Sequence, residues 1–349
     1  MKYFKTRSSQ SFYIEPVGFD KYTEKEILQY ALGANLYMPA TLDNVLNKLV
    51  EERLGNIGSI TLCLEDAIPE SQVKEAQEKV LKLLSELYDA RENNNSLSLP
   101  LLFIRVRNHD QFLELIQEMK TEHLKVVCGF VFPKFCSDNA SQYMETLLSL
   151  KRTHNETLYC MPIIEEARSL YKENRCEELL KIKSILSEYR DLILNIRVGG
   201  TDFSSLYGLR RDIQTSIYDI KVVSDCLADI LNIFSRQKDG YVVSGPVWEY
   251  YSWNKTSREI EGLKRELRLD LQNGFIGKTV IHLSQAEVVN EQYIVRYEDY
   301  VDATAILSSN GGVFGGYTGN KMNEVSPHLT WARKILSRAK VFGVANRVL

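Results

Sequence analysis

The chain has 349 residues, of which 44% are hydrophobic and 26% are charged, the balance of an ordinary globular protein rather than a disordered one. Lysine and arginine number 43 against 46 aspartate and glutamate, for a net charge of −3, which excludes the basic footprint of a dedicated nucleic-acid-binding protein. No run of about eighteen uncharged apolar residues suggests a membrane span, and the N-terminal residues lack the apolar core of a signal peptide.

Six cysteines occur in the chain, and none forms a CxxC pair or a Cys/His zinc spacing. Cys63, Cys128 and Cys160 lie in apolar segments, where a thiol behaves as a small hydrophobic side chain. We therefore expect free structural thiols in a reducing cytoplasm.

Short apolar runs alternate with longer amphipathic segments along most of the chain. The runs are LYMPA (36–40), ITLCLE (60–65), LLFIRV (101–106), GFVFPK (129–134), LYCMPIIE (158–165), LILNIRVG (192–199), YVVSGPVW (241–248) and GKTVIHL (277–283). Because they are almost continuously apolar, they are typical of parallel strands covered by helices. These runs predict an α/β protein with a closed (β/α)8 TIM barrel over residues 36–290. A doubly wound open sheet is the alternative, because periodicity does not reveal closure.

Several segments between the runs are predicted to be helices. Thr41 is expected to cap a helix whose apolar stripe reaches Val50, and a similar stripe predicts a helix within 210–237. Ser284 and Glu287 have the spacing of a capping box.

Two segments flank the predicted barrel. Residues 1–35 are expected to form an N-terminal extension, and residues 291–349 a C-terminal helical segment. Helices are predicted near 297–309 and 327–340, and the glycine-rich stretch 311–320 is expected to be a mobile linker or lid.

Charged or glycine-rich residues follow five consecutive runs, at the end of the barrel where reactive groups lie in this fold. They are Glu65 and Asp66, Arg105 and Arg107, Lys134, Glu165, and the segment Gly199, Gly200, Thr201 and Asp202. Acidic residues after a strand can also stabilise the N-terminus of the next helix. Each of these residues, taken alone, could therefore have a structural role instead of a role in chemistry.

Glu165 and Asp202 follow neighbouring runs, and adjacent strands are about 4.8 Å apart, so their carboxylates can converge. Two like charges about 4 Å apart repel by roughly 4 kcal/mol at an effective dielectric of 20, and a shared cation would remove that cost. Oxygen ligands favour Mg²⁺. The alternatives are salt bridges at both residues, or a helix cap at one of them.

Two protein ligands leave room on the ion for a chelating 2-oxo or 2-hydroxy carboxylate. Gly199 and Gly200, followed by Thr201, would let backbone N–H groups approach a substrate carboxylate.

Three basic residues are also predicted at this end of the barrel. Arg105 could stabilise an enolate oxygen, or could pair with the acidic residues of the neighbouring strand. Arg107 lies on the same face of that strand. Lys134 could bind a substrate anion or neutralise Asp66.

Eight segments carry a family resemblance in the same order as in the family. They are LYMPAT, CLEDAIPE, FIRVRN, GFVFPK, PIIEEARSL, VGGTDFSSLYG, GFIGKTVIHLSQAEVVNE and GNKMNEVSPH. Together they resemble the HpcH/HpaI aldolase and citrate lyase β-subunit-like superfamily. The resemblance implies a TIM barrel and Mg²⁺-dependent cleavage or formation of carbon–carbon bonds, with 2-oxo acids or 3-hydroxyacyl-CoA thioesters as substrates.

The resemblance also assigns roles. It makes Glu165 and Asp202 the metal ligands and Arg105 the catalytic arginine, and it gives Glu65 and Asp66 the acidic pair that orders water and substrate. It further implies a homotrimer or homohexamer in which the C-terminal segment contacts a neighbouring subunit.

Some positions depart from the family pattern. Cys63 replaces an acid, Leu283 replaces a proline, and Gly319-Asn320 replaces the segment before Lys321 that can supply a catalytic acid. With these changes and the N-terminal extension, the chain resembles the divergent lyase-like branch associated with tellurite-resistance gene clusters.

The leading hypothesis is a Mg²⁺-dependent lyase or aldolase that stabilises an enolate of a small-molecule substrate, with no nucleic-acid or membrane partner. The alternative is a non-catalytic metabolite sensor that retains the metal pocket. A phosphoenolpyruvate-type enzyme that binds its phosphate at Lys134 and Arg105 is a third possibility.

Overall fold

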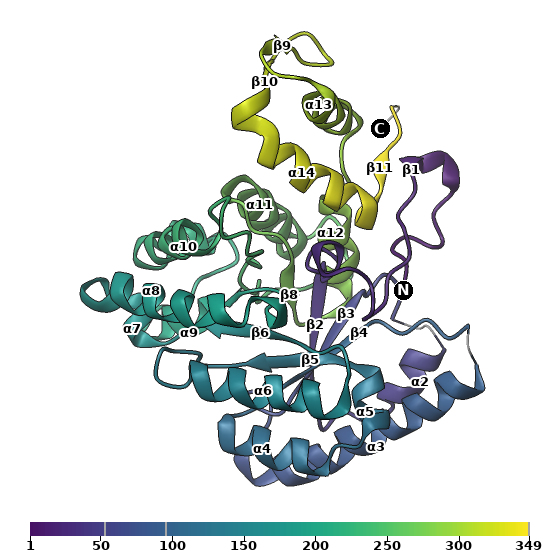
Figure 1. The fold of residues 1–349 in the computed structure, drawn as a ribbon, viewed down its shortest axis with the longest axis vertical. Coiled ribbons are helices and arrows are strands. Elements are labelled where there is room, and N and C mark those ends of the chain that lie inside the picture. Colours follow the sequence, from purple (N-terminus) through teal and green to yellow (C-terminus); the bar gives the residue numbers. More distant parts are fainter. Residues whose placement is uncertain (52–53, 95, 348–349) are drawn as a thin grey trace.

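A ring of parallel strands forms the centre of the molecule (Figure 1). The computed structural model describes residues 1–51, 54–94 and 96–347. Seven strands form one sheet in the order β7-β6-β5-β4-β3-β2-β8. They are β2 (Ala34–Pro39), β3 (Ser59–Cys63), β4 (Leu101–Arg105), β5 (Val127–Phe132), β6 (Tyr159–Ile164), β7 (Arg197–Val198) and β8 (Lys278–Val280).

The ring closes through the run at 241–248, which lies between β7 and β8. Ile196 pairs with Val243, and Gly245 pairs with Lys278, through isolated parallel bridges. A regular ladder does not continue past Gly245 because Pro246 has no N–H to donate. The predicted barrel is confirmed, and the open sheet is wrong.

Helices connect the strands and cover the outside of the ring (Figure 1). They are α2 (Val45–Val50), α3 (Val73–Asn93), α4 (His109–Glu118), α5 (Thr121–Val126), α6 (Ala140–His154), α7 (Ala167–Leu170), α8 (Lys172–Glu188), α9 (Gly200–Ser205), α10 (Lys221–Phe234), α11 (Arg258–Asn273) and α12 (Leu283–Tyr293), with single 3₁₀ turns η2 (Glu70–Gln72), η3 (Arg190–Leu192) and η4 (Ile217–Asp219). Within the described residues, no helix combines the length and apolar character needed to span a bilayer.

Two predicted helix caps are wrong. Thr41 lies in a turn, and α2 starts only at Val45, after Asn44 has taken a left-handed conformation with φ of 61°. His282, rather than Ser284, caps α12, because its ring nitrogen accepts the backbone N–H of Ser284 at 3.2 Å.

The helix predicted within 210–237 is shorter than expected. It forms only over α10, after the turn η4. The preceding residues are irregular because Arg211 is buried there and its guanidinium pairs with Glu249 and Glu266. These long-range ion pairs override the local apolar periodicity.

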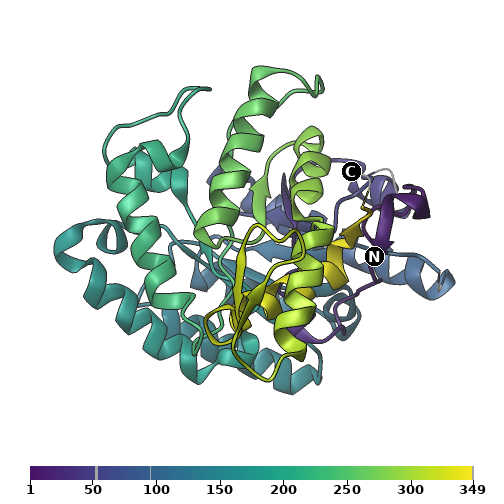
Figure 2. The same ribbon diagram turned by 90° about the horizontal axis from the view of Figure 1, so that it is seen from above.

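Strands near the two ends of the chain, β1 (Phe12–Ile14) and β11 (Val344–Ala345), lie side by side, as Figures 1 and 2 show from two directions. After the turn η1 (Ser9–Ser11), β1 pairs antiparallel with β11. Helices α13 (Tyr297–Ser308) and α14 (Val325–Phe342) pack on each other around a small apolar cluster of their own, and the short helix α1 (Lys25–Leu28) contacts α14. Both predicted C-terminal helices are confirmed.

The glycine-rich stretch 311–320 forms the first strand and the turn of a β-hairpin, and its role as a mobile linker or lid stays a prediction. Strand β9 (Val313–Gly315) pairs antiparallel with β10 (Met322–Glu324). Asp302 of α13 holds the connecting turn, because its carboxylate accepts the N–H of Tyr317 at 2.7 Å and pairs with Lys321 at 2.7 Å.

A buried ion network fixes β8 against α11. The Lys278 ammonium lies 3.0 Å from a carboxylate oxygen of Glu266 and 2.8 Å from one of Asp270, and all three side chains are fully buried. Glu266 also pairs with Arg211, so the network joins the strand, the helix and the irregular segment that follows α9.

Replacement of Lys278 by methionine should therefore destabilise the protein by about 3–5 kcal/mol, because it leaves buried carboxylates without their cation. Urea unfolding measures the effect. The matched control is Lys255→Met, which removes an exposed ion pair with Glu287 at 2.6 Å and should cost less than about 1 kcal/mol. Equal effects of the two substitutions would contradict this view of the network.

Candidate active site

A cavity of about 440 Å³ opens at the carboxyl ends of the barrel strands, which is a size suited to a small molecule. Its lining comes from six of the seven sheet strands or the residues just after them, and from the run at 241–248. The lining residues are Tyr37, Pro39, Cys63, Asp66, Ala67, Arg105, Ile163, Glu165, Arg197, Val198, Gly199, Gly200, Thr201, Asp202, Val247, Thr279 and Ile281.

Glu165 and Asp202 come together in this cavity. Glu165 directly follows β6 and is only 5% exposed, and Asp202 lies in the first turn of α9. A Cβ atom placed on Gly199 would stand 2.4 Å from Oε2 of Glu165 and 3.1 Å from Oδ2 of Asp202. The two oxygens therefore border one small space that exists because residue 199 has no side chain.

The surroundings make negative charge on these carboxylates unfavourable. Burial raises the pKa of Glu165 to about 7, and the neighbouring charge of Asp202 adds to that rise. Burial also raises the pKa of Asp202, with a further contribution from Asp66. A cation between the two oxygens would offset both effects.

The donor set at this space fits Mg²⁺. The described residues contain no group of three or more His, Cys, Asp or Glu side chains placed to hold a metal. Mg²⁺ does not require such a group, because it commonly binds through one or two carboxylates and completes its octahedron with water or substrate oxygens. Glu165 and Asp202 supply hard oxygen ligands, and the missing Cβ of Gly199 leaves the room between them.

Glu65 is a buried counter-ion for two cations. It is 2% exposed, and its two carboxylate oxygens contact the Lys134 ammonium and the Arg105 guanidinium. Arg105 also donates to Oδ2 of Asp66 at 2.9 Å. Of the two alternatives for Arg105, the salt bridges with the acidic residues of the neighbouring strand are confirmed. They hold its guanidinium at the cavity wall, and its action on an enolate oxygen stays a prediction.

Lys134 connects this ion cluster to Glu165 through its backbone. Its N–H donates to Oε1 of Glu165 at 2.8 Å, while its ammonium lies 3.5 Å from Oδ1 of Asp66. Lys134 takes a left-handed conformation with φ of 47°, which is uncommon for a residue other than glycine. This conformation aims the N–H at the carboxylate, while Oε2 of Glu165 borders the space that it shares with Asp202.

The remaining predicted residues divide into two groups. Gly199, Gly200 and Thr201 line the cavity. Arg107 is not among the described residues that line it, and its guanidinium instead donates to the carbonyl oxygen of Ile68 at 3.0 Å.

Among the cavity residues that the sequence did not predict for the site, three carry a polar nitrogen or oxygen on their side chains: Tyr37, Arg197 and Thr279. Arg197 is 2% exposed and lies on β7, two residues before Gly199. The available signal was a single charged residue within a largely apolar run, in phase with Gly199, which lines the cavity.

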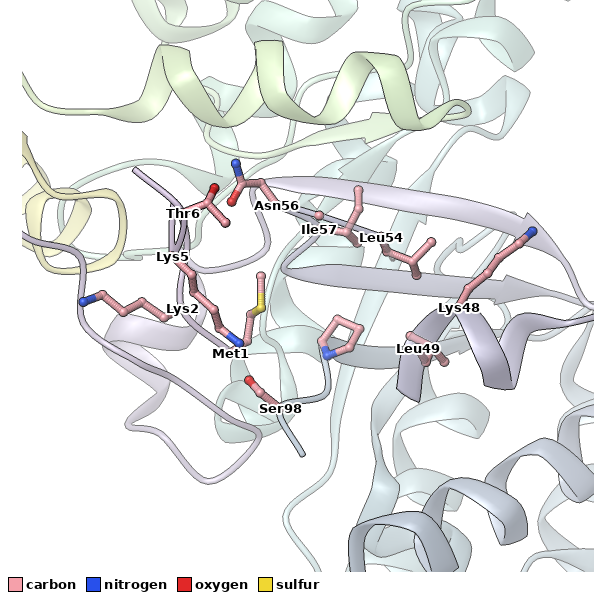
Figure 3. Close-up of a pocket in the computed structure, with 12 residues that line it drawn as sticks. Met1, Lys2, Lys5, Thr6, Lys48, Leu49, Leu54, Asn56, Ile57 and Ser98 are labelled. Atoms are coloured by element: carbon pink, nitrogen blue, oxygen red, sulfur yellow. The ribbon is translucent and has the colours of Figure 1, made fainter. Parts of the chain in front are cut away.

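A second pocket lies at the opposite end of the barrel, near the residues that precede β3 and β4 (Figure 3). Its described lining contains lysines but no acidic residue. Lys2 pairs with Glu15 at 2.9 Å, and the α-amino group of Met1 donates to the carbonyl oxygen of Phe19 at 2.6 Å. This pocket lacks the opposed charges found at the carboxyl ends of the strands.

Known proteins with similar sequences and folds are carbon–carbon lyases. The mitochondrial citramalyl-CoA lyases of Rattus norvegicus and Homo sapiens are each 24% identical to this chain, over 74% of it and 70% of their own length. A citrate lyase from Burkholderia xenovorans has a similar fold, with a TM-score of 0.66 and 16% identity over 91% of this chain and 94% of its own.

A second solved structure is CitE from Mycobacterium tuberculosis in complex with magnesium, acetoacetate and coenzyme A. It has a TM-score of 0.55 and 21% identity, over 89% of this chain and 99% of its own.

A family model of C–C bond lyases with the TIM-barrel fold matches residues 26–344. This match covers the closed barrel, the carboxylate pair and the C-terminal helices, and it agrees with the superfamily predicted from the eight segments. The protein therefore belongs to the C–C bond lyase family of the TIM-barrel fold, within the HpcH/HpaI aldolase and citrate lyase β-subunit-like superfamily.

Proposed function

We propose that the protein is a Mg²⁺-dependent carbon–carbon lyase of the citrate lyase β type, acting on a 2-oxo acid or a 3-hydroxyacyl substrate. The observation that carries the proposal is the meeting of the Glu165 and Asp202 carboxylates at the space beside Gly199, within the same cavity as Arg105. The magnesium complex of the CitE structure supports the choice of metal.

Glu165 and Asp202 would hold the ion. When bound, Mg²⁺ would supply positive charge that lowers the energy of negative oxygen atoms on a chelating substrate. Lys134 orients one of the two ligands through its backbone N–H.

Arg105 would stabilise the enolate that forms when the carbon–carbon bond breaks. Its salt bridges with Glu65 and Asp66 fix the guanidinium before substrate arrives, and a preorganised charge is worth more than one that must reorient. Glu65 is then a positioning residue, since both of its oxygens are engaged with cations.

Asp66 is the member of the acidic pair that lines the cavity, and it is the candidate proton acceptor. In the cleavage direction, a substrate hydroxyl would lose its proton to Asp66 or to a water that Asp66 orders. The carbon–carbon bond would then break, its electron pair would form the enolate, and a new carbonyl would remain on the other fragment.

Two further parts of the proposal concern the state of the protein in the cell. We infer a homo-oligomer, a trimer or hexamer, in which the C-terminal segment contacts a neighbouring subunit. We also infer a reducing cytoplasm, which the six free cysteines fit.

Glu165→Gln and Asp202→Asn should each abolish measurable Mg²⁺ binding in calorimetry and leave the circular dichroism spectrum unchanged, because an amide keeps the shape but not the charge. Thr201→Ala is the control, since Thr201 is an exposed neighbour in the same turn. Mg²⁺-dependent turnover of oxaloacetate, malate or an acyl-CoA ester, followed by NMR, would support the lyase. Binding of these compounds without any product would favour the metabolite sensor.

The metal-free protein should lose stability as the pH rises from about 4.5 to about 7. The folded-state pKa of Glu165, about 7, lies above its ordinary value of 4.5, so the folded state binds more protons across that window and its free energy of unfolding falls as they leave. The loss should reach a few kcal/mol at most. Urea unfolding in EDTA should therefore find Glu165→Gln more stable than the wild type at about pH 8, with a smaller difference at about pH 5. A difference that does not change with pH would contradict the assignment.

Gly199→Ala should weaken Mg²⁺ binding by roughly tenfold or more, because the new Cβ would meet both Cβ and Oε2 of Glu165 at 2.4 Å. The φ at this position is −89°, outside the left-handed region, so the effect comes from the contact with Glu165, and circular dichroism checks that the fold is kept. Calorimetry measures the affinity, with Thr201→Ala again as the control. Unchanged affinity would mean that the space beside Gly199 does not hold the ion.

A further inference from the structure

A cavity of about 480 Å³, here called the amino-end cavity, lies at the amino ends of β4 and β5. It adjoins the smaller pocket of Figure 3, and Lys2, Lys5 and Ser98, which that figure labels, line both. The segment before β4 and the first residues of that strand form one wall, and the N-terminal extension forms the other. Arg105 at the far end of β4 lines the candidate active-site cavity, so the two cavities lie at opposite ends of the barrel.

The described lining of the amino-end cavity is basic. Its charged side chains are those of Lys2, Lys5, Asp20, Lys21 and Arg91. The Asp20 carboxylate is engaged in its own turn, because it accepts the N–H of Tyr22 at 2.9 Å and the hydroxyl of Thr23 at 3.4 Å. The walls therefore present more positive than negative charge to the space between them.

Arg91 is a half-buried cation without a counter-ion. It lies in the last turn of α3, and its guanidinium forms no ion pair or hydrogen bond within residues 1–51, 54–94 and 96–347. By contrast, Lys2 pairs with Glu15 at 2.9 Å. Burial lowers the pKa of Lys21, and the nearby charge of Arg91 adds to this fall. Two cations thus repel each other at this cavity, and a bound anion would relieve the repulsion.

Lys21 gives the cavity a fixed, buried donor. It is only 5% exposed. Its ammonium donates to the carbonyl oxygen of Leu124 at 2.5 Å and to the carboxylate of Glu156 at 3.1 Å. An ammonium has three N–H donors, so a third is left for a ligand in the cavity that Lys21 lines.

A structural role explains only part of this arrangement. A cation in the last turn of a helix interacts favourably with the helix dipole, which accounts for Arg91 taken alone. It does not account for Lys2, Lys5 and Lys21, which reach the same cavity from the N-terminal extension. Basic side chains from two separate parts of the chain converge on one space, as in an anion-binding site.

We propose that the amino-end cavity binds a phosphorylated small molecule, with its phosphate at Arg91 and Lys21. A phosphate monoester carries a charge of roughly −1.5 to −2 near pH 7, which suits several cations around one space, and a guanidinium binds its oxygens in pairs. Phe19, Leu97 and Leu99 line the cavity beside these cations and would contact the organic part of the ligand. The volume is typical of small-molecule sites. This inference does not depend on the proposed function.

Inorganic pyrophosphate is the probe, and EDTA keeps the proposed Mg²⁺ site empty during the measurement. Calorimetry should find pyrophosphate bound by the wild type, and Arg91→Met should weaken that binding roughly tenfold or more. Arg91→Lys should keep part of the affinity, because the positive charge remains. Circular dichroism should be unchanged in both variants, since Arg91 is half-buried at a helix end.

Arg152→Met is the matched control. Arg152 also lies in the last turn of a helix, α6, but it is exposed and outside the described lining of the cavity. The two methionine variants change the net charge equally, so a general attraction of pyrophosphate to the protein would weaken equally in both. Equal losses, no binding by the wild type, or an affinity unchanged in Arg91→Met would each overturn the inference. The last result would place the anion elsewhere, such as at Arg105 and Lys134.

Discussion

The candidate active site depends on the close approach of two carboxylates, which the absence of a side chain at Gly199 makes possible. The carboxylates of Glu165 and Asp202 border the space that a Cβ of residue 199 would fill, and burial raises the pKa of both. A fold gains nothing in stability from such a pair, so its presence at the mouth of a closed barrel is best explained by a cation that binds there.

The surrounding residues hold that pair and the neighbouring arginine in place before any ligand arrives. Glu65 is buried between Lys134 and Arg105, and the left-handed backbone of Lys134 directs its N–H at Glu165. Glu65 thus positions the Arg105 guanidinium, which would stabilise an enolate. The backbone of Lys134 links this ion cluster to the carboxylate pair. The buried ion network around Lys278 fixes β8 against α11 on another side of the barrel.

The sequence was sufficient for the parts that follow from strand periodicity. The ends of apolar runs located Glu165, Asp202 and Arg105, because parallel strands in a barrel all present their carboxyl ends at one rim. It was not sufficient where a distant contact decides the local structure. Asp302 orders the glycine-rich hairpin, and the ion pairs of Arg211 shorten a helix. Arg197 was missed because a residue inside an apolar run is ordinarily part of the core.

A crystal of the protein soaked with Mg²⁺ and a 2-oxo acid would show whether the two carboxylates bind one ion. We expect an octahedral ion at about 2.1 Å from one oxygen of Glu165 and one of Asp202, with the acid completing its coordination. Carboxylates that turn away from each other, or an ion bound elsewhere with the space beside Gly199 filled by water alone, would contradict this expectation.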